Sequence, residues 1–312
     1  MNKNLKLSVC IPTYNRHDIL KENLDLFLKV NKNNFEIIIV DDGSTDDTKE
    51  LVYNVAKKAS FKIKYFYQEN QGTSKSLIKS ILNSSGEYIV YQGSDDFVVI
   101  NIFEKFLNGD YDHILLTTNI AGIAFKCKYI DNQIVGNNNT DEKISKYSIE
   151  HYYDDNRGDK KIYIKNNILN EIVKKYIDFE SHIPSAVLLI DIDKKYNFYF
   201  SNIAIAIKNY LEDGITNNYF EHIRNFPQGY LILSSKIINF KYKNNLNSLK
   251  LKTKQYINFT KYLLFSYLNF KKISHLERLN LYQYLLIFIL SPIGLGLFLY
   301  DNLKKFQIFL TK

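Results

Sequence analysis

The stretch Gly86-Glu-Tyr-Ile-Val-Tyr-Gln-Gly-Ser-Asp-Asp96 decides the fold. In it, an apolar, β-prone run ends abruptly in two adjacent carboxylates, Asp95 and Asp96. In an open α/β sheet, ligands bind just beyond the carboxyl ends of the strands. Two acidic side chains at that place repel each other unless a cation lies between them. A divalent metal that carries a diphosphate meets this need, because hard cations prefer carboxylate and phosphate oxygens.

Two earlier segments repeat the pattern of a strand that ends in a polar turn. They are Leu7-Ser-Val-Cys-Ile-Pro-Thr-Tyr-Asn-Arg16 and Phe35-Glu-Ile-Ile-Ile-Val-Asp-Asp-Gly-Ser-Thr-Asp-Asp47, and the second again ends in paired acids. Three strands of this kind predict one cleft along one edge of a sheet.

Strands and helices alternate through the first part of the chain. We expect strands over 5–12, 35–40, 62–67 and 87–92, and helices over 17–30, 46–58 and 73–84. This alternation predicts a mostly parallel, Rossmann-like sheet with flanking helices. Further along, the sequence predicts a polar lid or solvated loop over 131–160, a helix over 202–222 and a strand pair over 226–243.

Bulk composition narrows the class of protein. A chain of 312 residues with 46% hydrophobic content fits one large α/β domain plus an appendage. Two cysteines form no disulfide framework, and the N-terminus lacks an apolar signal segment, so we expect action on the cytosolic side. A net charge of +8 suits a phosphorylated substrate or an anionic membrane. No nucleic-acid-binding motif occurs in the sequence, so no nucleic-acid partner is expected.

The C-terminal part has a distinct composition. No charged residue occurs between Arg278 and Asp301, and the run Leu281–Tyr300 is just long enough to span a membrane. We expect three residues to break this run into two short halves: Pro292, Gly294 and Gly296. Cationic flanks favour an interfacial or re-entrant membrane segment. A full span and a helix pair docked on the rest of the protein are the alternatives.

Five linked motifs then carry a resemblance over about the first 100 residues. They are Ser8-Val-Cys-Ile-Pro-Thr-Tyr-Asn-Arg16, Val40-Asp-Asp-Gly-Ser-Thr-Asp-Asp-Thr48, Asn70-Gln-Gly72, Gly86-Glu-Tyr-Ile89 and Ser94-Asp-Asp96. In order and spacing they resemble the inverting glycosyltransferases of family 2, which have the GT-A fold. The resemblance implies a GT-A domain over 1–250, followed in our interpretation by a helical membrane-associating region over 251–312.

The resemblance also implies roles for single residues. Pro12 and Tyr14 line the nucleotide base, and Asp42 accepts a hydrogen bond from its ring N–H. Asp95 holds the ribose or the water shell of the metal, and Asp96 ligates Mg²⁺ or Mn²⁺. That metal stabilises the charge that develops on the departing nucleoside diphosphate.

The sequence departs from the family pattern at two places. Gly93 stands where many members have a third Asp, and Leu77-Ile78 stands where many have an Arg-Asn pair. We expect the missing cation near the phosphates to come from Lys75, Lys79 or Arg16.

The catalytic base is expected in the second half of the chain. Inversion requires a carboxylate that takes the proton of the acceptor hydroxyl. The segment Leu211-Glu-Asp-Gly-Ile-Thr-Asn-Asn-Tyr-Phe220 resembles the place of the family's base, which selects Asp213. Asp191 and Asp193 are the rivals, and an acid that merely caps a helix start is the structural alternative. His182 and His222 are interpreted as structural.

Together these features imply a metal-dependent hexosyltransferase that uses a nucleotide-diphosphate sugar, in this family most often a UDP-sugar. With the tail on the cytoplasmic face of the inner membrane, the expected acceptor is a lipid-linked, polyprenyl-diphosphate oligosaccharide of a bacterium. Two alternatives stay open. One is a transferase with a soluble or protein acceptor whose tail is a packing or dimer interface. The other is a non-catalytic module that binds sugar nucleotides.

Overall fold

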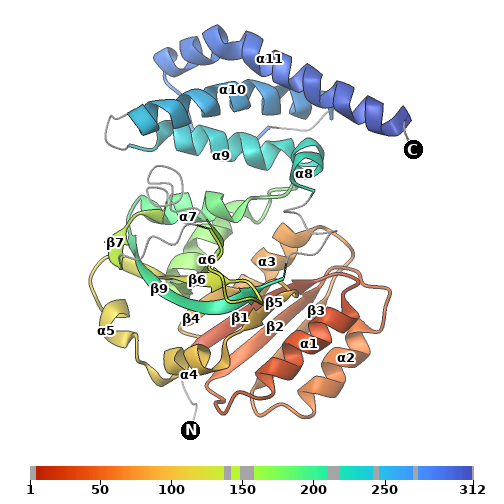
Figure 1. Ribbon diagram of the computed structural model, residues 1–312, viewed down its shortest axis with the longest axis vertical. Coiled ribbons are helices and arrows are strands. Elements are labelled where there is room, and N and C mark those ends of the chain that lie inside the picture. Colours follow the sequence, from red (N-terminus) through yellow and green to blue (C-terminus); the bar gives the residue numbers. More distant parts are fainter. Residues whose placement is uncertain are drawn as a thin grey trace. The chain divides into compact units, whose positions relative to one another are not determined.

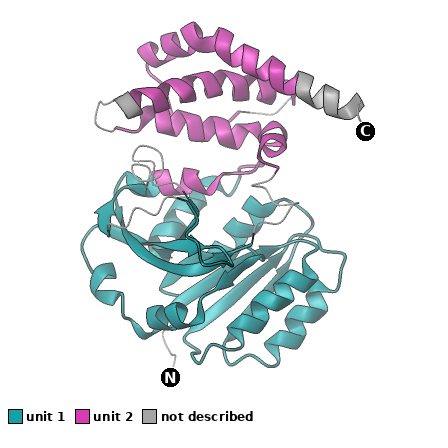
Figure 2. Ribbon diagram, viewed as in Figure 1, with its two compact units in different colours: residues 1–178, 191–212 teal, residues 179–190, 213–312 magenta. Residues whose placement is uncertain are grey.

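The computed structural model describes residues 5–136, 142–147, 158–209, 218–241, 246–269 and 273–310. The chain forms two compact units, shown in Figure 2: residues 1–178 with 191–212, and residues 179–190 with 213–312. The predicted division of the chain at residue 250 into a transferase domain and a membrane-associating region stays a prediction.

The strands of the first unit form one mixed sheet (Figure 1). In chain order they are β1 (Leu7–Thr13), β2 (Phe35–Asp41), β3 (Lys62–Tyr67), β4 (Tyr88–Tyr91), β5 (Asp96–Val98), β6 (Ile120–Lys128), β7 (Lys143–Ser145), β8 (Lys160–Lys165) and β9 (Asn197–Lys208). Their order in space is β3-β2-β1-β4-β8-β6-β9-β5, and β7 pairs with β9. The helices of this unit are α1 (His17–Phe27), α2 (Thr48–Ala56), α3 (Thr73–Leu82), α4 (Ile100–Asn108), α5 (Asp112–Leu115) and α6 (Asn166–Val173).

The first four strands are parallel and confirm the predicted fold class. β1 lies between β2 and β4, and β3 flanks β2. Every residue of β1 and β2 is buried, as expected for strands that are covered on both faces. The chain turns back after β3, so right-handed crossovers place α1 and α2 on one face and α3 on the other. Figure 1 shows α1 and α2 side by side.

The remaining strands make the sheet mixed rather than all parallel. β8 runs antiparallel to both β4 and β6, and β9 runs parallel to β6 and antiparallel to β5. The helix predicted over 202–222 is therefore wrong over residues 202–208, because residues 197–208 form β9, and residues 210–217 lie outside the described residues. Phe198 and Phe200 alternate with the half-buried Tyr199 there, and this period of two fits a strand. Of the segment 131–160, predicted as a lid or loop, residues 137–141 and 148–157 lie outside the described residues.

Aromatic side chains fill the core of the first unit. Phe35 lies at its centre, stacked on Phe61 with ring centroids 4.4 Å apart and edge-on to Phe103 at 5.2 Å. Phe27 meets Phe103 edge-on at 5.5 Å. Each such pair stabilises the fold by about 0.5–1.5 kcal/mol beyond the burial of its area. This cluster fixes α1 and α4 against the parallel strands.

The second unit is helical. Its helices are α8 (Tyr219–Asn225), α9 (Pro227–Asn239), α10 (Leu246–Leu268) and α11 (Leu281–Leu310), while α7 (Ser185–Asp193) includes residues of both units. α10 packs against both α9 and α11. The strand pair predicted over 226–243 is wrong, because this segment forms α9. The helix is buried on nearly all sides, and such an apolar run cannot be told from a strand by periodicity alone.

The predicted break at Pro292 is also wrong, since α11 continues through it. A proline inside a helix leaves the carbonyl four residues earlier without its N–H partner. Here the Ser291 hydroxyl donates to the Phe288 carbonyl at 2.7 Å and replaces that bond. Gly294 lies directly on α10, where a Cβ would be 2.7 Å from the Ile257 carbonyl oxygen. The missing side chain therefore lets the two helices pack closely.

One helix among the described residues is long and apolar enough to cross a membrane. It covers Leu281–Asn302, with a mean hydropathy of 1.8 and only 17% of its most apolar window buried. Large apolar side chains on it are exposed, including Tyr282, Leu285, Phe288, Ile289 and Ile293. Length and composition alone make this segment a weak indication of a membrane contact.

The close approach of β6 and β8 gives a test of the fold. A Cβ at Gly122 would lie 2.0 Å from the Tyr163 carbonyl oxygen, whereas one at Gly296 in α11 would meet nothing within 4 Å. We predict that Gly122→Ala lowers the free energy of unfolding by about 1–3 kcal/mol through overpacking. The control Gly296→Ala is expected to leave it unchanged or raise it by up to about 1 kcal/mol. Urea unfolding followed by circular dichroism measures both, and equal stabilities would contradict the strand pairing.

Candidate functional site

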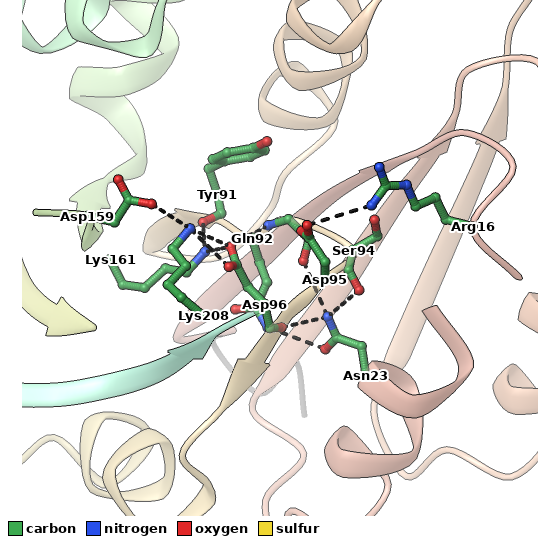
Figure 3. Close-up of polar contacts among 11 residues, drawn as sticks. Arg16, Asn23, Tyr91, Gln92, Ser94, Asp95, Asp96, Asp159, Lys161 and Lys208 are labelled. Carbon is green, nitrogen blue, oxygen red and sulfur yellow. Dashed lines mark hydrogen bonds and ion pairs between the residues drawn. The ribbon is translucent and has the colours of Figure 1, made fainter. Parts of the chain in front are cut away.

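The carboxyl ends of β1, β2 and β4 meet at one edge of the sheet, as the sequence predicts. Residues 92–96 form the turn that follows β4 and leads into β5. Figure 3 shows this turn with the charged side chains around it. All the residues of this site belong to the first unit.

The buried side chain of Asn23, from α1, holds the turn in place. Its Nδ2 donates to the carbonyl oxygens of Gly93 at 3.3 Å, Ser94 at 3.1 Å and Asp96 at 2.7 Å. Gln92 adds a second donor, with its Nε2 2.8 Å from the Asp96 carbonyl oxygen. Sequence reasoning missed Asn23, because its partners are 70 to 73 residues away. The two amides set the direction in which the paired acids point.

Asp96 is buried and bound by two lysines. Its Oδ2 lies 2.5 Å from the Lys161 Nζ, and its Oδ1 lies 2.9 Å from the Lys208 Nζ. The N–H of Gly93 donates to Oδ2 at 3.0 Å. Lys161 comes from β8 and Lys208 from β9, so two strands of the mixed half bring the cations to the end of β4. Sequence analysis did not select either lysine.

In the cluster of Asp96, Lys161, Lys208 and Asp159, opposite charges stabilise one another. Burial alone would raise the pKa of Asp96, but the ammonium groups of Lys161 and Lys208 outweigh it, and the pKa lies below its ordinary value. Burial would likewise lower the pKa of Lys208, yet the carboxylates of Asp96 and Asp159 hold that pKa above the usual range. Asp159 Oδ2 is 3.2 Å from the Lys208 Nζ. Asp96 and Lys208 are therefore both charged at neutral pH.

Asp95 is more accessible than Asp96. Burial and the neighbouring Asp96 carboxylate raise its pKa, while Arg16 opposes the rise. The Arg16 Nη1 lies 3.6 Å from Asp95 Oδ2. The first polar turn is thus joined to the acidic turn, as expected if both face one ligand.

The structure explains why glycine occupies position 93, where many family members have an aspartate. A Cβ at Gly93 would lie 2.6 Å from Asp95 Oδ1 and 3.0 Å from Asp96 Oδ2. A side chain at this position would force the Asp95 carboxylate to move and would lie tight against the Asp96 carboxylate. The arrangement around Asp96 therefore depends on glycine at position 93.

Asp42 holds a second loop at the same edge. Its carboxylate accepts from the Gln68 side chain at 2.7 Å and from the backbone N–H groups of Gln71 at 3.0 Å and Gly72 at 2.7 Å. A carboxylate offers about four acceptor positions, so about one remains for a ligand. Asp42 positions the loop before α3, and its predicted contact with a nucleotide base stays a prediction.

The remaining predicted nucleotide residues lie on and after β1. Pro12 is buried within the strand, and the ring of Tyr14 is 47% exposed just beyond it. The turn after β1 is fastened to the turn after β2, since the Asn15 N–H donates to Ser44 Oγ at 2.9 Å and the Thr45 N–H donates to Asn15 Oδ1 at 2.8 Å. The exposed ring of Tyr14 therefore lies on a loop that hydrogen bonds hold in place.

The other predicted residues have separate surroundings. Lys75 donates to the Ile177 carbonyl at 2.6 Å and Lys79 to the Tyr67 carbonyl at 3.1 Å, so both ammonium groups are directed to backbone oxygens. Asp191 accepts a hydrogen bond from the Tyr176 hydroxyl at 2.6 Å, and Asp193 accepts one from a backbone N–H at 2.8 Å. Both acids are buried, which fits a structural role. Asp213, the predicted base, lies outside the described residues.

The two histidines of the second unit pack against each other. The rings of His182 and His222 are edge-on with centroids 4.3 Å apart, and His222 Nδ1 lies 3.1 Å from the Tyr230 hydroxyl. Burial lowers the pKa of His182 to about 3, so this ring is neutral. These contacts agree with the structural interpretation.

The residues present do not fit the expected Mg²⁺ or Mn²⁺ as they are placed. A divalent metal needs carboxylate oxygens that are open to it. Two ammonium groups and an N–H already occupy the Asp96 carboxylate. Within the described ranges, no group of three or more His, Cys, Asp or Glu side chains gathers as a metal site. The divalent cofactor stays a prediction.

Asn23 gives the test of this geometry. We predict that Asn23→Ala lowers the free energy of unfolding by about 1–3 kcal/mol, because the buried Asn23 amide is the donor to the Ser94 carbonyl. The Gly93 and Asp96 carbonyls would each keep one donor, the Asp96 N–H and the Gln92 amide. The control Asn83→Ala removes an exposed side chain that bonds only its own helix end, at 2.8 Å, and should cost less than about 0.5 kcal/mol. Chemical unfolding measures both variants. Similar losses in the two would mean that Asn23 does not hold the acidic turn.

Residues 8–118 match the sequence profile of glycosyl transferase family 2. A glycosyltransferase of Rickettsia felis is 39% identical over 129 residues, which cover 40% of this chain and 21% of the relative. A Campylobacter jejuni protein, named GalNAc(5)-diNAcBac-PP-undecaprenol beta-1,3-glucosyltransferase, is 32% identical over 114 residues, or 35% of this chain and 37% of its own. The chain thus spans about a fifth to a third of the length of these two curated relatives.

Solved structures share the fold at low sequence identity. S. aureus TarS in complex with UDP-GlcNAc aligns with a TM-score of 0.55 and 16% identity, over 95% of this chain and 81% of that one. The mannosyltransferase PcManGT from Pyrobaculum calidifontis, in complex with GDP-Man and Mn²⁺, aligns with a TM-score of 0.51 and 14% identity, over 84% and 73%. Residues 8–118 of this chain are thus similar to glycosyl transferase family 2, and the chain shares the fold of these solved structures.

Proposed function

We propose that the protein is a glycosyltransferase that moves a sugar from a nucleotide-diphosphate donor to a hydroxyl group of an acceptor. The observation that carries the proposal is the meeting of three family motifs at one sheet edge. Arg16 after β1 pairs with Asp95 after β4, and Asp42 after β2 holds the loop that precedes α3. The family resemblance assigns Asp42 and Asp95 to the nucleotide, and Arg16 is one of the cations expected near its phosphates.

The donor base is proposed to bind beyond β1. Tyr14 offers an exposed aromatic face on which a base can stack. The neighbouring Thr13 hydroxyl is buried and has no hydrogen-bond partner among the described residues. A buried polar group without a partner is costly, so a ligand atom that bonds it is favoured. Every nucleobase offers a face and polar edges, and the S. aureus TarS complex with UDP-GlcNAc supports uridine among them.

The proposed reaction inverts the anomeric carbon. The acceptor hydroxyl oxygen attacks that carbon, the bond from the carbon to the diphosphate oxygen breaks, and the electron pair leaves with the nucleoside diphosphate. The acceptor proton passes to a carboxylate, for which Asp213 is proposed. Asp191 and Asp193 are less suitable, because both are buried and hydrogen-bonded within their own unit.

The proposed acceptor is a lipid-linked, polyprenyl-diphosphate oligosaccharide at the cytoplasmic face of the inner membrane. Two observations support it. The Campylobacter relative carries an undecaprenol-linked substrate in its name. In addition, α11 exposes a row of large apolar side chains that water solvates poorly. We propose that residues 251–312 hold the transferase domain, residues 1–250, at the lipid surface.

A screen of nucleotide sugars tests the transferase. Full-length protein in detergent is incubated with each donor and an extract of bacterial lipid-linked oligosaccharides, and released nucleoside diphosphate is measured. We predict release from one donor, loss of turnover by about 10²–10⁴-fold in Asp213→Asn, and an unchanged donor affinity in that variant. The control Glu221→Gln changes an exposed carboxylate of the same unit and should keep full turnover. Full activity in Asp213→Asn would remove it as the base.

Sedimentation with vesicles tests the lipid contact. A variant with Leu285, Phe288 and Ile289 all changed to serine removes three exposed apolar side chains of α11. We predict that its binding to vesicles with anionic lipid is at least about tenfold weaker, because those side chains no longer leave water. Its control changes Leu116 and Ile130, which are 80% and 71% exposed on the first unit, to serine. Equal binding of both variants would contradict a membrane role for α11.

A further inference from the structure

We infer that the ammonium groups of Lys161 and Lys208, in place of a divalent metal, supply the positive charge that binds the donor diphosphate. This inference rests on the proposed function, since it concerns the same donor site. It reverses the role expected for Asp96, which becomes the residue that positions two cations. Lys208 is the group that contacts the phosphate oxygens, and Lys161 holds Asp96 from the interior.

The net charge at Asp96 is the same whether this carboxylate binds a divalent metal or two lysines. A carboxylate that carries a divalent metal has one net positive charge. The Asp96 carboxylate with two ammonium groups, at 2.5 and 2.9 Å, also has one net positive charge. Once Asp159 has moved away from Lys208, the cluster therefore offers a diphosphate a net positive charge without an ion from solution. Glycine in place of the third family acid agrees with this, since one fewer carboxylate at position 93 needs neutralising.

A metal at Asp96 would have to expel the lysines. Its ligand bonds need the oxygens that the lysines and the Gly93 N–H now occupy. The side chain of Lys161 is only 4% exposed, so it would stay inside the protein beside a dication and without its carboxylate partner. Of its printed contacts it would keep the Tyr91 carbonyl, at 3.2 Å. A buried charge without its partner is strongly unfavourable. The buried cluster as built therefore disfavours metal binding.

Lys208 has the access that a phosphate ligand needs. Its side chain is 17% exposed, and on the side away from Asp96 it pairs with Asp159 at 3.2 Å. The side chain of Asp159 is 47% exposed, so its ion pair with Lys208 is partly screened by water and an anion can compete with it. An oxygen of the diphosphate takes its place and keeps the charge-assisted bond to the ammonium group. Asp159 thus marks the position of the incoming anion.

Calorimetry of nucleoside diphosphate binding tests the inference. UDP, GDP, CDP and dTDP are titrated into the full-length protein, once with EDTA and once with excess Mn²⁺. We expect one nucleotide to bind with affinities that agree within about twofold in the two buffers, because the charge comes from the protein. Binding that requires Mn²⁺ would overturn the inference and leave the proposed function standing. Binding of no nucleotide in either buffer would overturn both.

Two variants in EDTA sharpen the test. Lys208→Met should weaken binding about 10- to 100-fold, the range for a hydrogen bond to a charged group. Asp159→Asn should strengthen it severalfold, because it removes the competing carboxylate, and misfolding cannot imitate this gain. The control Lys64→Met breaks another pair with a buried carboxylate, Glu36 at 2.9 Å, and should not change binding. Weaker binding in Asp159→Asn, or unchanged binding in Lys208→Met, would contradict a contact between Lys208 and the diphosphate.

Discussion

The ion cluster around Asp96 is the interaction on which the site depends. It joins the turn after β4 to β8 and β9, and so ties the parallel half of the sheet to the mixed half. The mixed half has a functional consequence, since each lysine reaches the acidic turn from a different strand. Breaking such a pair on one side leaves a buried charge, at a cost of about 3–5 kcal/mol. The cluster therefore fixes strand positions as well as charge, and any change in it alters the structure and the ligand site together.

A second constraint acts on the backbone of the turn. Asn23 and Gln92 hold the carbonyl groups of residues 93–96, and Gly93 leaves the space that the two carboxylates fill. The amide side chains thus set the direction of the turn, while the two lysines balance the charge of Asp96. Asp95, turned toward Arg16, is half-open to ligands, while Asp96 is enclosed. Two adjacent acids with the same chemistry take different roles because their surroundings differ in burial and in partners.

The sequence predicted the first hundred residues well, because strand, turn and helix signals there are local. The runs that became β1 and β2 are mostly apolar and end in polar turns. The sequence therefore predicted both that they are strands and at which edge of the sheet they end. Lys161 and Lys208 could not be found in this way, since the pairs with Asp96 join residues 65 and 112 positions apart. β9 and α9 were missed because apolar runs fit either period until their packing partners are known. The continuity of α11 depends on one hydroxyl at Ser291, which has no signal in hydropathy.

The central claim is that Asp96 binds lysines while Lys208 binds the donor. A crystal structure of the full-length protein, grown with UDP and Mn²⁺ and measured at an X-ray energy where manganese scatters anomalously, tests it most directly. We predict that phosphate oxygens lie within hydrogen-bonding distance of the Lys208 Nζ and that Asp159 is displaced from that ammonium group. We also predict no manganese signal at the Asp96 carboxylate. A manganese peak at ligand distance from Asp96, with Lys161 and Lys208 moved away, would contradict it.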